Sequence, residues 1–281
     1  MMDSADLISL EVEVRDLIGE ETAKFWTQAK AFRAINDEMS RLARRIIALD
    51  KGYFEVVVTP TPAASYVLPR NCILVRNVEL YVDNGWMQPR WISDHTRGHY
   101  QTIGAGYPWA VRVQDNTLYF ENGIGSASQM RVNYTRMPAD MVYATLASGS
   151  ATTAVFAAGS VSVLDDVYIG DTIKVLSGTG VYQISTATDY VASTRTLTIP
   201  SGATLDNTSV VSWLLPEPLN KFSDIVVAGA AMRLLMRRRD DNLYKMIQEN
   251  YDRDVADMMD VLAQRQTVGA EHGNYQPNGD D

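Results

Sequence analysis

Apolar residues near the amino terminus repeat every three or four positions, a spacing that predicts helices. The longer stripe consists of Phe32, Ile35, Met39, Leu42 and Ile46. Thr27 stands at the N-cap position before it, although Lys30 occupies the place where a capping box has Glu. The shorter stripe consists of Leu7, Leu10, Val14 and Leu17. Gly19 follows as a helix stop, so we predict two amino-terminal helices.

Two more helical stripes occur near the carboxyl terminus. Val227, Ala231, Leu234 and Leu235 mark the first, and the small residues 228–231 favour close packing of that helix. The second stripe consists of Leu243, Ile247, Tyr251, Val255, Met258 and Leu262. Arg237–Arg239 would end the first helix and Asp240–Asp241 would begin the second, which suits the helix dipole at both ends. The pattern predicts a carboxy-terminal helical hairpin.

Residues 53–138 have a strand-like and aromatic pattern instead. Asn84-Gly85 separates two apolar runs and favours a type I′ turn, so a hairpin is predicted there. A second hairpin is predicted from 110 to 120, with Gln114-Asp115-Asn116 as its turn. We therefore expect an antiparallel β region next to the helices.

Residues 139–213 differ from both neighbours, because they contain only two basic side chains, Lys174 and Arg195, and many Ser, Thr, Ala and Val. Five short strands are predicted there: Ser160–Leu164, Asp171–Leu176, Val181–Ser185, Thr194–Ile199 and Val210–Leu214. Ala144–Ser160 has the composition of a linker, although Val155 and Phe156 indicate partial strand pairing. The expected fold is α+β: a helical bundle, an antiparallel β region and an inserted small all-β domain, either barrel or sandwich.

Composition limits the function classes. The net charge of −9 and the pI near 4.9 argue against a surface that holds DNA, which needs clustered Lys and Arg. The single cysteine, Cys72, excludes an intramolecular disulfide and is interpreted as a small core residue. Asp3, Asp6 and Glu11 do not fit a signal peptide, and no apolar run reaches the ~20 residues of a membrane span. We expect a soluble protein that folds in a reducing cytoplasm, without membrane contact.

Motifs for catalysis are weak. His95 and His99 have the i, i+4 spacing of a zinc pair, but Gly98 lowers the helix propensity between them and no third ligand is evident. The glycines of 104–106 lack the third glycine and the preceding strand of a dinucleotide loop. We therefore predict no catalytic residue, no metal site and no cofactor.

Six weak motifs follow one another in a specific order. They are Trp26-Thr27 with Ile35-Asn36, Glu38 and Leu42-Ala43; Leu68-Pro69; Gly106-Tyr107-Pro108; a strand that ends at Pro138; Pro216-Glu217-Pro218; and a long helix that carries Tyr251. This order resembles the head–tail adaptor (connector or neck) proteins of tailed bacteriophages. The resemblance covers residues 4–138 and 214–266, and its helical core signature falls on Trp26, Ile35, Asn36 and Leu42.

The resemblance implies a structural protein of the virion neck, assembled in the host cytoplasm. Its subunits would form a homo-oligomeric ring, expected to be dodecameric, beneath the portal protein. A tail, nozzle or fibre protein would attach below or outside, and packaged DNA would pass through without specific binding. Residues 1–138 and 214–266 would form the adaptor core, 139–213 the inserted β domain, and 267–281 a flexible tail.

Two segments are candidate functional surfaces. Glu249, Asp252, Asp257 and Asp260 lie on or beside the polar face of the last helix and are candidates to line the DNA channel. The alternative is an ordinary solvated face. In the tail, Val268, Tyr275 and Pro277 are apolar anchors that would dock into the portal on binding. The alternative is a loosely ordered chain end.

Two other function classes remain open at the sequence level. The aromatic β region from Tyr81 to Tyr119 is compatible with a carbohydrate- or host-receptor-binding module of a virion. A hydrolase would have to depend on the His95–His99 pair. A ring protein fits better, because closed rings need two different complementary faces on each subunit, and helices with projecting hairpins supply them.

Overall fold

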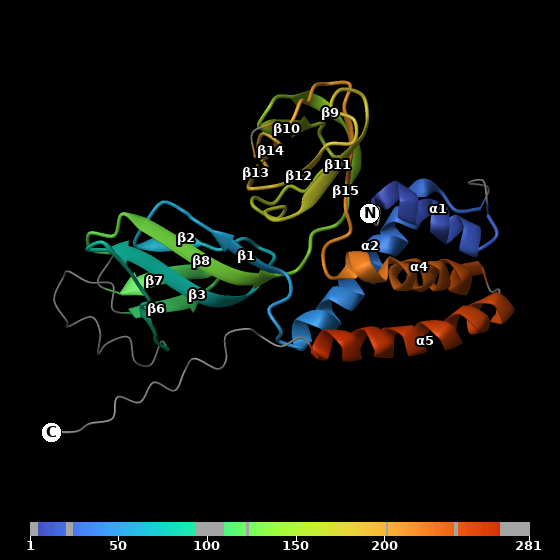
Figure 1. Cartoon of the computed structure of the whole chain (residues 1–281), viewed down its shortest axis with the longest axis horizontal. Coiled ribbons are helices and arrows are strands. Elements are labelled where there is room, and N and C mark those ends of the chain that lie inside the picture. The colour runs from blue at the N-terminus through green and yellow to red at the C-terminus, as the bar shows by residue number, and fades with distance from the viewer. Residues whose placement is uncertain are drawn as a thin grey trace.

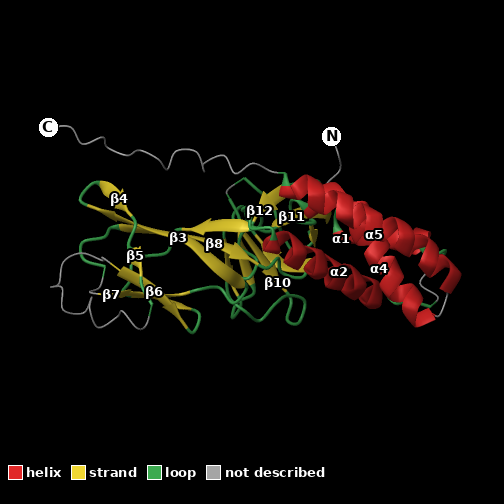
Figure 2. Cartoon of the chain, turned by 90° about the horizontal axis from the view of Figure 1, so that it is seen from below, coloured by secondary structure: helices red, strands yellow, loops and turns green. Residues whose placement is uncertain are grey.

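The computed structural model describes residues 5–20, 25–93, 110–121, 124–200, 202–238 and 241–264. The molecule is a mixed α+β protein, with the helices grouped at one end and the strands in two separate bodies (Figure 1). A view from below shows the helices lying side by side and the first β region extending away from them (Figure 2).

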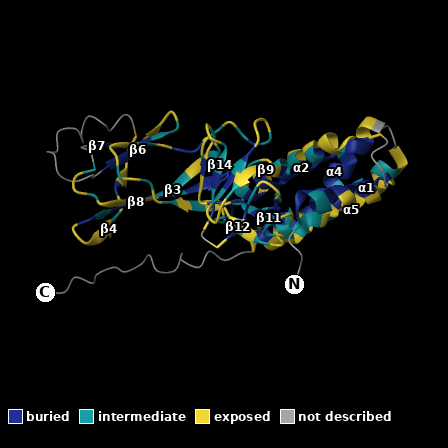
Figure 3. Cartoon of the chain, turned by 90° about the horizontal axis from the view of Figure 1, so that it is seen from above, coloured by how far each residue is buried: buried dark blue, intermediate teal, exposed yellow. Residues whose placement is uncertain are grey.

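Four α-helices occur in the described part of the chain: α1 (Leu7–Leu17), α2 (Gln28–Ala48), α4 (Ser223–Arg238) and α5 (Asp241–Ala263). Helix α4 contacts the other three and is the central element. A short 3-10 helix, η2 (Leu219–Phe222), leads into α4 after the proline-rich entry. Residues are buried where the helices face one another and exposed on their outer sides (Figure 3).

The ends of the amino-terminal helices follow partly from capping. The Asp6 carboxylate accepts from the backbone of Ile8 and Ser9, and the Ser9 hydroxyl group accepts from Asp6 N–H, which makes a capping box. Thr27 is the N-cap of α2, as expected, but its side chain forms no capping hydrogen bond. The prediction that Leu17 belongs to the buried stripe was wrong: Leu17 is exposed, and the next residue, Ile18, is buried in its place at the helix end.

The first β region is a β-sandwich of two antiparallel-rich sheets. One sheet has the order β1–β8–β3–β4, with bounds Glu55–Val58, Gln129–Arg136, Cys72–Val82 and Gly85–Met87. The other has the order β2–β7–β6–β5, with bounds Ser65–Val67, Thr117–Glu121, Ala110–Gln114 and Arg90–Trp91. Side chains from both sheets form one apolar core, in which Leu80, Val111, Leu118 and Val132 are fully buried.

Both predicted hairpins of the sandwich are present. Strands β6 and β7 pair across Asp115 and Asn116, which both have positive φ, as type I′ geometry requires. In the β3–β4 hairpin the central residues are Asp83 and Asn84, because Gly85 pairs with Val82. The turn therefore lies one residue earlier than the predicted Asn84-Gly85.

The second β region is a single seven-stranded sheet, called here the curled sheet. Its order is β12–β11–β15–β9–β10–β14–β13, with bounds Ile184–Thr186, Thr172–Ser177, Val210–Trp213, Tyr143–Gly149, Thr153–Phe156, Thr196–Thr198 and Asp189–Val191. The two edge strands are consecutive in the chain, and only Ala187 and Thr188 separate them. This short link requires the sheet to curl until its edges meet.

The sequence pattern predicted this sheet incompletely. The expected strand Ser160–Leu164 is absent, and the described backbone there is irregular, with bends. Ala144–Ser160 is not a linker, because it contains most of β9 and all of β10. In β9 the buried residues Ala144 and Leu146 alternate with the exposed Thr145, and small side chains conceal this alternation in the sequence.

The curled sheet and the helices share one apolar core, whereas the sandwich has its own. Trp213 of β15 is almost fully buried and packs against the rings of Phe156 and Tyr168, with ring centroids 5.3 and 5.1 Å away. The common core extends from these aromatic residues to α1, α2 and α4. The curled sheet is therefore packed directly on the helical end.

Candidate functional site

The helical end is organised around one buried carboxylate, Glu38 of α2. It is 1% exposed and accepts hydrogen bonds from Arg41 Nε at 3.1 Å, Arg233 Nε at 3.0 Å and the Tyr251 hydroxyl group at 2.6 Å. These donors come from α2, α4 and α5. A buried carboxylate without such partners would cost several kcal/mol, so Glu38 fixes the three helices relative to one another.

Gly229 makes this arrangement possible. A Cβ atom at that position would lie 2.5 Å from Glu38 Cγ, a distance that side chains essentially never adopt. The absent side chain therefore lets α4 approach α2 closely at the carboxylate. Burial raises the pKa of Tyr251, and its hydrogen bond to Glu38 raises it further, so the phenol stays neutral and donates its proton.

The same packing determines which side of α5 faces outward. Ile247, Tyr251, Val255, Met258 and Leu262 are buried against the other helices, as their spacing predicted. The four candidate channel-lining residues Glu249, Asp252, Asp257 and Asp260 are all exposed. None of the four forms an ion pair with another described residue, so their charges face solvent. We call these four residues the acidic face of α5.

Asn36 of the signature links the helices to the curled sheet. Its side-chain amide donates to the Met141 carbonyl at 3.1 Å and its carbonyl accepts from the Met141 N–H at 2.8 Å. Met141 lies just before β9. This two-bond contact satisfies both backbone groups of Met141 and explains the polar residue beside the apolar stripe.

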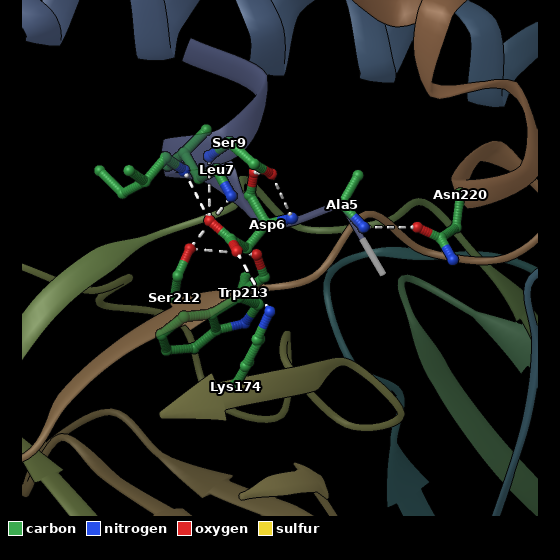
Figure 4. Close-up of polar contacts among 9 residues, drawn as sticks. Ala5, Asp6, Leu7, Ser9, Lys174, Ser212, Trp213 and Asn220 are labelled. Carbon is green, nitrogen blue, oxygen red and sulfur yellow. Dashed lines mark hydrogen bonds and ion pairs between the residues drawn. The ribbon is translucent and has the colours of Figure 1, made fainter. Parts of the chain in front are cut away.

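The amino-terminal segment forms a second link to the curled sheet (Figure 4). The N–H of Leu7 donates to the Ser212 hydroxyl group at 3.1 Å, and Lys174 Nζ lies 3.7 Å from the Asp6 carboxylate. The N–H of Ala5 donates to the Asn220 side chain at 2.9 Å. The start of α1 is therefore attached to both β15 and the entry to α4.

The sandwich meets the curled sheet through a buried ion pair between Arg136 of β8 and Asp171, at 2.5 Å. Burial raises the pKa of the Asp171 carboxyl group, and the Arg136 guanidinium opposes that shift. Asn71 adds hydrogen bonds to the carbonyls of Met137 and Val167, at 3.0 and 2.8 Å. A cavity of about 920 Å³ lies at this junction, and its lining includes both charged residues.

The structure places the other predicted site residues as follows. Trp26, Ile35 and Leu42 are buried in the common core. Val268, Tyr275 and Pro277 of the tail lie outside the described residues, and so do His95, His99 and the glycines of 104–106. Among the residues that the structure describes, no group of His, Cys, Asp and Glu has the arrangement of a metal site.

Sequence reasoning missed one polar network between α1 and α2. Arg15 contacts the Glu11 carboxylate at 2.8 Å and the Trp26 carbonyl at 3.1 Å, while Glu20 accepts from the Trp26 N–H at 2.9 Å. Glu11, Arg15 and Glu20 are all buried. The i, i+4 spacing of Glu11 and Arg15 was the available signal, but it is equally common on solvated helix faces.

With this geometry established, the comparisons place the chain. Residues 5–172 match the family described as SU10 adaptor protein, and this span is more than half of the chain. The chain belongs to this family of phage head–tail adaptors. The match continues past Pro138 through β9 and β10 to the start of β11, and it ends before α4 and α5. No curated protein matches the chain.

Family membership supports a structural role in a phage particle, in contact with head and tail proteins. It favours a protein without catalytic activity. Among the described helices, none combines the length and the apolar character that a membrane span requires.

Proposed function

We propose that this adaptor forms a closed homo-oligomeric ring, dodecameric by the family resemblance, beneath the portal of a tailed phage. It joins head to tail in the virion neck. Membership of the adaptor family is the observation that carries this proposal. A ring of identical contacts needs two different complementary faces on each subunit. The separate sandwich and helical ends give the chain such distinct faces.

The acidic face of α5 is the candidate surface of the DNA channel. Its four carboxylates are exposed, whereas the opposite side of α5 is buried by the other helices. Negative charge along a channel repels the phosphate backbone. Carboxylates do not displace the cations that surround DNA, so the channel does not bind the duplex tightly. DNA can then slide during ejection. The alternative assignment of this face is ordinary solvated surface.

The partners follow from the position in the neck. The portal lies above, and we assign its contact to Val268, Tyr275 and Pro277 of residues 267–281. A tail, nozzle or fibre protein attaches below or outside. Residues 1–138 and 214–266 are proposed as the adaptor core, and 139–213 as an inserted β domain that contacts other proteins of the neck. Trp26, Ile35, Asn36 and Leu42 serve the helical core and have no direct part in binding.

A receptor- or carbohydrate-binding role for the aromatic β region has less support. Trp86 packs against Tyr81 and lies under the Arg131 guanidinium, 4.0 Å from the ring centroid. Tyr119 lies under Arg112 in the same way, at 4.6 Å. One face of each ring is covered by an arginine of the same chain, so neither ring offers both faces for stacking on a ligand.

The test of the ring is a mass measurement followed by imaging. The purified protein is examined by native mass spectrometry, alone and mixed with the portal of the same phage, and the complex is imaged by electron microscopy. We expect a single closed ring coaxial with the portal, with α5 beside the lumen. A protein that stays monomeric in both samples would contradict the ring, and a ring with α5 outside would contradict the channel assignment only.

A further inference from the structure

The hairpin between β11 and β12 carries exposed apolar side chains. Val181 is 42% exposed, Tyr182 is 79% exposed and Ile184 is 54% exposed. Val181 and Tyr182 lie in the turn just before β12, and Ile184 is the first residue of that strand, so the three exposed side chains are close together in the chain. We call Val181, Tyr182 and Ile184 the hairpin tip. Three neighbouring exposed apolar groups are typical of a protein contact site.

The hairpin tip is held in one conformation by its neighbours. The Thr179 hydroxyl group donates to the Asp206 carboxylate at 2.6 Å, and the Ser209 hydroxyl group donates to the Thr179 carbonyl at 2.6 Å. The Gln183 side chain accepts from the Thr204 N–H at 2.8 Å. The hairpin is thus bound to residues 204–209, and little entropy is lost when it binds a partner.

Glycine and backbone strain support the same conclusion. Gly178 has φ +81, and a Cβ atom there would lie 2.5 Å from the Thr208 carbonyl carbon, so the two segments can approach only with glycine. Tyr182 has φ +69, which costs a bulky side chain about 1 kcal/mol or more. Its N–H donates to the Val175 carbonyl at 2.8 Å. The fold thus presents a strained, rigid tyrosine to solvent.

A groove of similar chemistry lies on the sandwich. It has a volume of about 510 Å³ and is lined by Leu68, Cys72, Ile73, Leu74, Val75, Trp91, Val113 and Asn116. Ile73, Leu74, Trp91 and Val113 are all exposed apolar residues. The described lining includes no residue of the curled sheet. The hairpin tip therefore does not fill the groove of its own chain.

The hairpin tip and the described groove lining carry no charged side chain, but the segments around them differ in charge. Residues 139–213, which form the curled sheet, contain six acidic and two basic side chains. Residues 53–138, whose described part forms the sandwich, contain six acidic and seven basic side chains, so this segment has a small positive balance in an acidic chain. Like charge therefore does not oppose contact between a sandwich and the curled sheet of another copy, whereas it opposes contact between two curled sheets.

We propose that the hairpin tip of one subunit inserts into the sandwich groove of a second copy of this chain, with Tyr182 as the central anchor. Tip and groove are different surfaces, so the contact is heterologous and can repeat around a ring. The inference rests on the proposed ring and specifies the contact that closes it. Tyrosine is a frequent anchor at interfaces because its ring buries a large area at little entropic cost.

The first test replaces the anchor. Tyr182→Asp should raise the concentration needed for half-maximal ring assembly by about tenfold or more, since it removes the aromatic contact. Aspartate adopts positive φ more easily than tyrosine, so the monomer should fold with an unchanged circular dichroism spectrum. Val163→Asp is the matched control, because Val163 is 87% exposed in the same segment 139–213 but lies outside the hairpin tip. This control should assemble like the parent.

The second test uses the single native cysteine, Cys72, which lines the groove. Tyr182→Cys also lacks the aromatic anchor, so this protein is assembled well above the concentration that the parent needs, then oxidised with copper phenanthroline and run on a non-reducing gel. We expect a ladder of disulfide-linked subunits. In the double variant with Cys72→Ser this ladder should disappear, and only simple dimers should remain. Val163→Cys should give no ladder.

The results of these two tests distinguish a failure of the tip-in-groove contact from a failure of the proposed ring. Rings that assemble equally well with Tyr182→Asp, or a ladder that persists without Cys72, would overturn the tip-in-groove contact and leave the ring intact. A parent protein that forms no oligomer, alone or with portal, would overturn the ring itself. A Tyr182→Cys ring without any ladder would also exclude the proposed contact.

Discussion

At the scale of single residues, buried and half-buried polar groups connect the parts of this molecule. Glu38 receives hydrogen bonds from three helices, Asn36 binds both backbone groups of Met141, and Arg136 pairs with Asp171 across the sandwich junction. Each group would be costly to bury alone. Their partners are distant in the chain, so these positions define the tertiary arrangement.

Asp166 is the residue for which we predict a clear pH effect. Burial raises the pKa of its carboxyl group to about 6, and the adjacent Asp189 carboxylate adds to the shift. The unfolded value is about 3.9, so the folded state binds the proton more tightly between these limits. Stability from this group is fully present below pH 4 and is lost as the pH rises through 6. Asp166→Asn should remove that loss.

The measurement is urea unfolding of Asp166→Asn and the parent at pH 4 and pH 7. We expect equal free energies at pH 4 and a gain of about 1 kcal/mol for the variant at pH 7, after allowance for solvent screening of this half-buried site. Asp115→Asn is the control, because Asp115 also has a positive φ but lies in an exposed turn. A gain of the same size at both pH values would contradict the titration of Asp166.

At the scale of elements, the strongly periodic helices were predicted well and the small-residue strands were not. The stripe in α2 is buried at Ile35, Met39, Leu42 and Ile46. Apolar residues three and four positions apart lie on one face in a helix and in few other structures, so this spacing predicts a buried helix face clearly. Strands β9, β10 and β13 carry Ala, Thr, Ser and Asp, whose weak preferences gave little signal. Pairing with β15 and β14 determines that they are strands.

The close packing of α4 on α2 gives a second prediction. Gly229→Ala should destabilise the protein by about 1–3 kcal/mol, because overpacking at Glu38 outweighs the gain of about 1 kcal/mol in helix propensity. Thermal and urea unfolding measure the change. In the double variant with Glu38→Asp, the shorter side chain makes room, so the total loss should be smaller than the sum of the single losses. A Gly229→Ala protein more stable than the parent would show that the helices are not in close contact there.

At the scale of the whole molecule, one end is helical, one end is a sandwich, and the curled sheet is packed on the helices between them (Figure 1). The acidic face of α5 is exposed on the outer side of the single chain, where a ring can turn it toward a lumen. The function proposed for this face depends on assembly, and charge substitution tests it.

Replacement of Asp252, Asp257 and Asp260 by lysine should leave folding nearly unchanged. Substitutions at exposed positions rarely change the free energy of unfolding by more than about 0.5 kcal/mol each. Phage particles with these rings should package DNA but release it more slowly at low salt, and approach the parent rate as salt screens the new charges. Lysine at Glu13, Asp16 and Asp37 is the control, since it makes the same charge change on exposed positions of α1 and α2. Equal ejection rates for both triple variants would assign the α5 face to solvated surface.

The final prediction concerns residues 267–281, which lie outside the described part of the chain. Truncation after Gln266 should keep the parent melting temperature, since the core ends with Leu262. It should abolish joining to portal-capped heads, which co-purification measures. A substitution of Tyr275 by Ser is the milder variant and should weaken joining in part. Full stoichiometry of truncated protein on the portal would move the docking site to another surface.

The sequence by itself determined the helices, the two hairpins of the sandwich and the class of protein. Hydrophobic periodicity specified α1, α2, α4 and α5, positive-φ residues specified two hairpin turns, and the order of weak motifs indicated the adaptor family. Each of these signals depends on neighbouring residues or on the order of motifs along the chain, so a single sequence is enough to show it.

Only the tertiary structure decided which distant residues meet. Glu38, Arg233 and Tyr251 come together because Gly229 allows two helices to approach, and the segment 139–213 shares the helical core through Trp213. The rigid display of Tyr182 depends on residues 204–209, more than twenty positions away. Such contacts depend on packing and burial across the fold, which no local pattern records.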